Sequence, residues 1–228
     1  MQIWDKALEE YDQVVHIPMS SGLSGSCQTA MMLAMEDEYE GKVFVVDNQR
    51  ISITLAQSIK EAQMMADMGY DGAKIKKRLE ETKMDAGILI TVDTLQYLKK
   101  GGRITPAVAL IGTLLKIKPI LSIFGEKLDS YAKARTVKQA KAIMVEGIVK
   151  ELSERLHDPE CRHSHLGVAH TQNEDAALIF AEEVRAMFPC ADVTVAPLSL
   201  SVSCHIGPGS LAITATRKLV EEDENTPN

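Results

Sequence analysis

Three continuous apolar segments, separated by helical patterns, constrain the fold of this chain most strongly. They are Gln13–Met19, Val43–Asp47 and Gly87–Val92. The longest helical pattern between them covers about Ile53–Met68 and stops at Gly69. Strands that are apolar throughout and separated by helices are typical of a parallel sheet covered on both faces. The sequence therefore predicts an N-terminal lobe built on a doubly wound, mostly parallel sheet.

The pattern changes in the second half of the chain. Two short strand patterns, Pro119–Phe124 and Leu128–Ala134, flank a tight turn at Gly125-Glu126 and predict an antiparallel hairpin. Helical and strand patterns then alternate: Val137–Leu152, His165–Thr171, Asn173–Met187, Asp192–Ser199 and Leu211–Thr216. These elements are typical of an α+β lobe with a mixed or antiparallel sheet. The predicted fold class is α/β with two lobes, residues 1–115 and 116–228.

The charge balance disfavours binding to nucleic acids. The chain has 228 residues, with 25 Lys and Arg against 32 Asp and Glu, and a net charge of −7. Sequence-independent binding needs a basic surface, and base stacking needs aromatic side chains, which make up only 4% here. We therefore expect no nucleic-acid partner, and a DNA-binding regulator is a disfavoured alternative.

Cysteine spacing and apolar run length bear on the compartment. The four cysteines are scattered without a CxxC pair: Cys27, Cys161, Cys190 and Cys204. Reduced thiols in a cytoplasm are the simplest explanation. Residues 1–10 carry no signal-peptide pattern. The longest apolar run, Pro106–Leu115, is ten residues long, whereas a membrane span needs ~20. We expect a soluble cytoplasmic protein without an integral membrane segment.

A loop of small residues, Ser20–Ser26, follows the first predicted strand and precedes a helix; we call it the serine loop. Ligands of open α/β sheets bind at the carboxyl ends of strands, and helix N-termini offer free N–H groups to anions. The loop as a whole is therefore a candidate receptor for one anionic oxygen group, such as a carboxylate or phosphate. The loop is not a P-loop, and it lacks the last glycine of G-x-S-x-G. Turn and helix-capping chemistry explains these residues about equally well.

The second candidate is His205, within Ser203–Ser210, where a Gly-Pro-Gly turn predicts a constrained loop between strands. An imidazole there can donate a hydrogen bond to an anion or move a proton. A structural turn with an incidental histidine is the competing interpretation. That interpretation weakens only if His205 meets the serine loop in space.

Three weaker candidates complete the set. Arg103 ends Lys99-Lys100-Gly101-Gly102-Arg103, which a basic helix C-terminus with a glycine stop also explains. Arg135, at the end of a strand pattern, can hold an anion bidentately or is an ordinary surface charge. The alternating Cys161, His163 and His165 resemble metal ligands, but a fourth ligand is not evident, so we expect no metal.

Several stretches, in this order, resemble the DegV family of bacterial fatty-acid-binding proteins. They run from about Tyr11 to Thr216 and are HIPMSSGLSGSCQTA, VDTLQYLKKGGRI, IGTLLKIKPILSIFGEKL, AKAR and CHIGPGSLAITAT. The resemblance implies two lobes with a long-chain fatty acid between them, bound without a cofactor and without bond cleavage. It also implies that Ser21 holds the carboxylate, with Ser20, Gly22 and Ser24 as neighbours and His205 close by.

The resemblance further implies a partner, an ATP-dependent fatty acid kinase. The kinase would convert the presented acid to an acyl phosphate for phospholipid synthesis, and Arg135 and Arg103 are then candidate contacts to the head group or the partner. The apolar side chains expected along the acyl chain are Met31, Met35, Ile111 and Leu115. Family members usually begin with an Asp-Ser/Thr strand and a Thr-Ser-x-Pro loop. Neither precedes Gln13, so we expect the N-terminal sheet to lack its first strands.

An acyl hydrolase or transferase is the alternative function. It would use Ser24 as nucleophile and His205 as base. The missing elbow glycine argues against it. The chain also has no nucleotide-binding loop, so phosphoryl transfer needs a partner.

Overall fold

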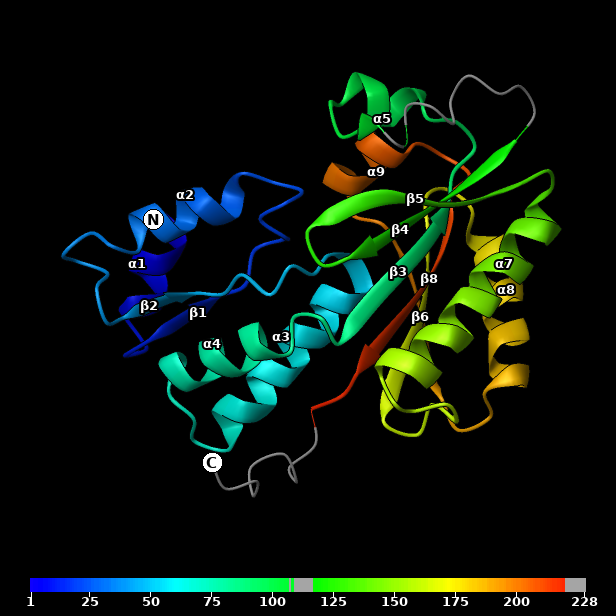
Figure 1. Ribbon diagram of the computed structural model, residues 1–228. Coiled ribbons are helices and arrows are strands. Elements are labelled where there is room, and N and C mark those ends of the chain that lie inside the picture. Colours follow the sequence, from blue (N-terminus) through cyan, green and yellow to red (C-terminus); the bar gives the residue numbers. More distant parts are fainter. Residues whose placement is uncertain (107, 109–116, 220–228) are drawn as a thin grey trace.

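The computed structural model describes residues 1–106, 108 and 117–219, which form two sheets (Figure 1). The smaller sheet pairs β1 (Val14–His16) in parallel with β2 (Val43–Val45). The larger sheet has the order β5-β4-β3-β8-β6-β7. Its six strands are β3 (Ala86–Thr91), β4 (Lys118–Phe124), β5 (Lys127–Ala134), β6 (Ser164–His170), β7 (Asp192–Pro197) and β8 (Leu211–Arg217). Only β6 and β7 pair in parallel within this sheet, so the predicted mixed α/β class is confirmed.

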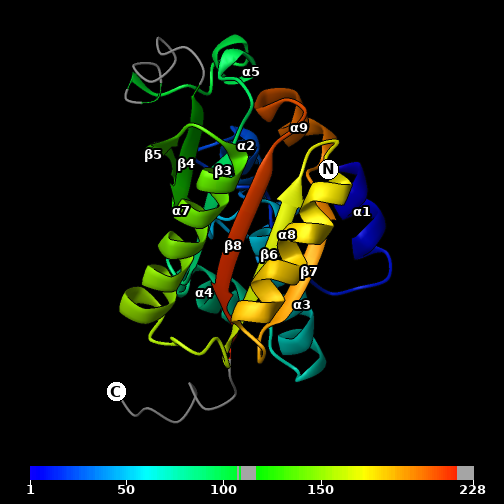
Figure 2. The same cartoon turned by 90° about the vertical axis from the view of Figure 1, so that its right-hand side faces the viewer.

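Helices link the sheets and cover the larger one. The small sheet is flanked by α1 (Gln2–Leu8) and α2 (Ser26–Leu33). The link between the sheets consists of α3 (Ser52–Asp67), which packs on β6 and β8, and α4 (Gly72–Glu81), which packs on β1 and β2. Figure 2 shows the opposite face of the large sheet under α7 (Val137–Lys150) and α8 (Glu174–Met187). A π-helical turn, η1 (Glu151–Arg155), extends α7.

Two short helices lie together at one end of the large sheet. They are α5 (Gln96–Lys100) and α9 (Leu200–Ile206). No helix in the described part of the chain is long and apolar enough to cross a membrane.

Helical periodicity explains how α7 and α8 cover the sheet. On α8, Ala177, Phe180, Ala181 and Val184 recur at the spacing of one helix face, and all four are buried. They pack in one cluster with α7 and with apolar residues of the central strands such as Ile213. The opposite face of the sheet contributes to a second apolar cluster, which also includes residues from α5 and α9. This second cluster surrounds the site described below.

The third apolar segment does not join the parallel sheet, and that prediction is wrong. β3 lies inside the large sheet and runs antiparallel to both β4 and β8, with all six residues buried. A central strand buried on both faces is apolar throughout in any sheet, so its composition does not identify its partners. The predicted lobe boundary between residues 115 and 116 lies outside the described residues and stays a prediction.

The four cysteines divide into two reactivity classes. Cys190 and Cys204 are exposed, whereas burial raises the pKa of Cys27 to about 11 and the pKa of Cys161 to about 12. The thiolate is the reactive form. We expect iodoacetamide at mildly alkaline pH to alkylate Cys190 and Cys204 in the folded protein, and the other two only after unfolding. Peptide mapping by mass spectrometry checks this, and equal native labelling of Cys27 and Cys190 would contradict it.

Candidate functional site

An apolar cavity with a few polar groups lies where the serine loop, the β4–β5 hairpin and the α5 and α9 helices meet. Its volume is about 140 Å³. The lining residues come from segments far apart in the sequence: Met19, Leu23, Ser24, Ile51, Leu98, Arg103, Ile123, Leu128, Ser201, Val202, His205 and Ile206. The cavity's mostly apolar lining with a small number of polar side chains is typical of a small-molecule site, while its volume is below the roughly 300–1,000 Å³ of sites that enclose drug-sized ligands.

The serine loop is held by the segment that follows β2. Ser20 N–H donates to the backbone oxygen of Arg50 at 2.9 Å, and Ser21 N–H donates to Asp47 Oδ1 at 3.3 Å. The Ser20 carbonyl in turn accepts from the Leu23 and Ser24 N–H groups. The expectation of several free N–H groups is therefore wrong for these positions, because the protein itself takes them up. The Ser24 hydroxyl is also engaged, since it donates to Ser26 Oγ, whereas the buried Ser20 hydroxyl has no partner among the described residues.

Gly22 lets the serine loop lie directly against the turn of the hairpin. A Cβ added at Gly22 would lie 2.3 Å from the backbone oxygen of Glu126. No side chain fits at that distance, so glycine is required by the close approach of two backbones. Gly22 thus helps to join the small sheet's loop to the large sheet.

His205 lies in the last turn of α9, so the prediction of a loop between strands is wrong. Its imidazole packs on the end of α5, where a Cβ added at Gly101 would lie 2.0 Å from Nδ1. The Gly-Gly-Arg and His-x-Gly-Pro-Gly motifs therefore meet in space. Because His205 and Ser24 line the same cavity, the condition that favours a functional histidine is met.

Two of the predicted carboxylate-binding residues have a buried polar atom with no hydrogen-bond partner among the described residues. The atoms are Nδ1 of the lining residue His205 and Ser20 Oγ, in a fully buried side chain next to the lining residue Met19. Ser20 and Ser21 themselves are not part of the cavity wall. Buried polar groups in folded proteins nearly always have a partner, and leaving one unpaired costs about 1–3 kcal/mol. A hydroxyl and an imidazole nitrogen together suit a ligand that carries a polar oxygen group.

The geometry does not support the hydrolase alternative. Ser24 Oγ donates to Ser26 Oγ at 3.0 Å and accepts from Ser26 N–H at 3.2 Å. A serine nucleophile needs a hydrogen bond to its general base. In the residues that the structure describes, Ser24 and His205 form no such bond. The Ser24 hydroxyl instead bonds within its own turn, to the first residue of α2.

The two candidate arginines lie in different places. Arg103 lines the cavity, and its Nη1 donates to the Gly101 carbonyl at 2.7 Å. Arg135 is exposed beyond the end of β5 and does not line the cavity. Arg103 is thus the arginine that the fold brings to the site.

The structure does not bring Met31 and Met35 to the cavity. Met31 packs in the small cluster around Trp4 and Tyr39, and Met35 is 79% exposed. The reason is that the apolar face of α2 covers the small sheet and not the large one. Ile111 and Leu115, the other two residues expected along the acyl chain, lie outside the described residues.

The alternating cysteine and histidines serve the fold. Cys161 Sγ lies 3.7 Å from the carbonyl of Ser164, to which it donates, and His165 Nε2 bonds Thr194 Oγ1 at 2.8 Å. Across residues 1–106, 108 and 117–219, no group of His, Cys, Asp and Glu side chains has the arrangement of a metal site.

The sequence patterns missed most of the cavity wall and the segment behind the serine loop. Ile51, Ile123 and Val202 are ordinary apolar residues whose neighbours depend on tertiary packing. The run Asp47–Arg50 did carry a signal, because it places polar residues at the carboxyl end of a parallel strand.

Comparison with known proteins identifies relatives along nearly the whole chain. The sequence model described as "Uncharacterised protein, DegV family" matches residues 1–218. A DegV domain-containing protein of Deinococcus radiodurans is 31% identical over 212 residues, which cover 93% of this chain and 73% of that protein. A Thermotoga maritima protein named fatty acid-binding protein is 28% identical over 205 residues, covering 89% of this chain and 68% of its own length.

The fold has solved counterparts as well. One is a DegV family protein from Thermus thermophilus whose structure is described as showing fatty acid binding. It is 29% identical and superposes with a TM-score of 0.83, over 95% of this chain and 75% of that protein.

Proposed function

Because the chain belongs to the DegV family, we propose that it binds a long-chain fatty acid in the cavity lined by Ser24, Arg103 and His205. The observation that carries the proposal is a mostly apolar cavity wall that includes His205, whose buried Nδ1 has no partner among the described residues, with the unpartnered Ser20 Oγ next to the lining residue Met19. A fatty acid matches both features of the site. Its carboxylate accepts hydrogen bonds from the polar groups, and its acyl chain packs against the apolar side chains. Relatives named or described as fatty-acid-binding proteins support the same ligand class.

The two parts of the ligand contribute differently to binding. Burial of the acyl chain supplies most of the free energy, ~0.8 kcal/mol for each methylene removed from water. The carboxylate is costly to bury unless donors meet it. In the proposed complex, the hydroxyls of Ser20 and Ser21 and the ring of His205 act as those donors and fix the orientation of the chain.

Presentation of the bound acid to an ATP-dependent fatty acid kinase is part of the proposal. Acyl phosphate formation for phospholipid synthesis in the cytoplasm then needs a partner that brings the nucleotide. Arg103 is the preferred contact to the head group or partner because it reaches the cavity, and Arg135 is a candidate for the partner alone. Loss of acyl phosphate formation in Arg135→Ala, with fatty acid binding unchanged, would support a kinase contact, and unchanged acyl phosphate formation would contradict one.

Mass spectrometry of the purified protein tests the ligand. We expect native spectra after bacterial expression to show one bound long-chain fatty acid. The Ser21→Ala/His205→Ala double variant should retain less than about one tenth of it, because two donors to the carboxylate are removed. Ser130→Ala, on β5 outside the cavity wall, serves as control. A protein that carries no lipid and takes up no added palmitate would overturn the proposed function.

A further inference from the structure

The segment Asp47–Ser52, which runs from just after β2 to the first residue of α3, has an unusual backbone; we call it the anchor loop. Gln49 and Ser52 adopt positive φ angles of 57° and 58°. Residues other than glycine seldom occupy this region, and they persist there only where surrounding contacts hold them. Two such residues within four positions show that the anchor loop is held in one conformation by its neighbours.

The anchor loop connects the serine loop with the hairpin. It supplies the acceptors for the Ser20 and Ser21 N–H groups, through the Arg50 carbonyl and the Asp47 carboxylate. On the hairpin side, Gln49 Nε2 donates to Glu126 Oε1 at 2.7 Å. Ile51 meanwhile forms part of the cavity wall. The position of the serine hydroxyls relative to the large sheet therefore depends on this loop.

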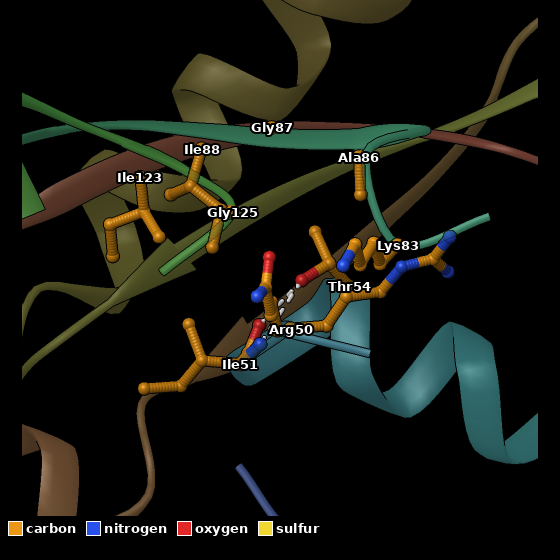
Figure 3. A pocket seen from close by; sticks show the side chains of 10 residues that line it. Arg50, Ile51, Thr54, Lys83, Ala86, Gly87, Ile88, Ile123 and Gly125 are labelled. Atoms are coloured by element: carbon orange, nitrogen blue, oxygen red, sulfur yellow. Dashed lines mark hydrogen bonds between the residues drawn. The ribbon is translucent and has the colours of Figure 1, made fainter. Parts of the chain in front are cut away.

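The Arg50 side chain anchors the loop from inside the protein. It is 2% exposed, and Figure 3 shows it beside Ile51 and Thr54 in a small pocket under the start of β3. Its Nη1 donates to Ser58 Oγ at 2.9 Å and its Nη2 donates to the Thr82 carbonyl at 2.7 Å. Glu61 Oε2, also buried, lies 3.5 Å from Nη1 and balances the charge. One guanidinium thus joins the anchor loop to α3 and to the end of α4.

We propose that Arg50 is a positioning residue for the carboxylate of the bound fatty acid, acting through the backbone of the serine loop. The inference rests on the proposed function. The guanidinium holds the anchor loop, the anchor loop holds Ser20 and Ser21, and their hydroxyls meet the carboxylate. A planar guanidinium satisfies its two acceptors in a fixed geometry that a lysine amine does not reproduce.

This role predicts a loss of head-group discrimination. A carboxylate depends on several charge-assisted hydrogen bonds with fixed directions, whereas an alcohol of equal chain length depends on fewer. If the serine loop shifts, the acid loses affinity and the alcohol does not. A purely structural role of Arg50 would weaken both ligands alike.

The test measures dissociation constants for palmitate and 1-hexadecanol on delipidated protein. We expect Arg50→Lys to lower the preference for palmitate over hexadecanol about tenfold. Ser58→Ala keeps the charge pair but removes the hydroxyl that accepts from Arg50 Nη1 and from Asn48 Nδ2, both of the anchor loop. It should lower the preference about threefold and covers the case in which Arg50→Lys does not fold. The matched control is Arg185→Lys on α8, whose guanidinium also bonds a backbone carbonyl, that of Val193, and a glutamate, Glu182.

The outcomes separate the inference from the function it rests on. A wild-type preference for palmitate that falls in the Arg50 and Ser58 variants and is unchanged in Arg185→Lys supports the positioning role. Proportional loss of both affinities, with the preference unchanged, makes Arg50 a residue of the fold alone and overturns the inference. If the wild-type protein binds neither compound, the proposed function itself fails and the inference fails with it.

Discussion

Gly101→Ala is expected to weaken fatty acid binding about tenfold or more while leaving the fold intact. The Gly101 backbone has φ −78°, which alanine adopts without strain. Its new methyl group, however, would lie 2.0 Å from His205 Nδ1, and the imidazole must rotate away. The variant therefore removes the histidine from the carboxylate without changing its identity. Titration with palmitate measures the loss of affinity, and a thermal melting curve checks that the fold is intact.

A double-mutant cycle with His205→Ala provides the control for Gly101→Ala. If the alanine acts by displacing His205, the substitution has no further effect once the imidazole is gone. Additive losses of affinity would show that Gly101 acts on the site by another route. A large fall in melting temperature in the single variant would equally contradict the expected mechanism.

Gly22→Ala is expected to impair both stability and binding. The added Cβ would lie 2.3 Å from the backbone oxygen of Glu126 and 2.6 Å from its Cβ, and a backbone does not rotate away as a side chain does. The serine loop must therefore move off the hairpin. We expect a loss of about 1–3 kcal/mol in the free energy of unfolding, typical of overpacking, and loss of most palmitate binding. Chemical denaturation and ligand titration measure the two quantities.

Gly25→Ala, three residues further along the same loop, is the matched control for Gly22→Ala. Gly25 has φ −68°, and no atom lies within 4 Å of an added Cβ. Alanine at this position should change neither the free energy of unfolding nor the affinity for palmitate appreciably. Equal effects of both substitutions would show that the loop tolerates no side chain in general, and that contact with Glu126 is not the cause.

Local patterns were sufficient for most helices and for the hairpin. The two predicted strands, Pro119–Phe124 and Leu128–Ala134, correspond to β4 and β5. They flank Gly125, whose φ of 74° matches the predicted tight turn. The pattern over Ile53–Met68 corresponds to α3, which spans Ser52–Asp67. In these cases the determining interactions lie within a few residues of one another, as turn geometry and helical periodicity require.

The candidate site was predicted only in part. The serine loop and His205 were identified from residue types and position, and the cavity brings both to one place. The roles expected for Met31 and Met35 were not supported, because the face that α2 buries is chosen by its neighbours. Arg50 was not anticipated at all, since a single arginine after a strand gives no sign that it is buried.

The chain's own residues thus specified an α/β class, a small-residue loop at a strand end and a histidine suited to an anion, because propensity, turn chemistry and charge act locally. The tertiary structure decided that β3 joins the large sheet, that Gly101 makes room for His205, and that Arg50 supports the serine loop. Each of these depends on contacts between segments far apart in the sequence. The burial and packing that select such contacts arise only when the whole chain is folded.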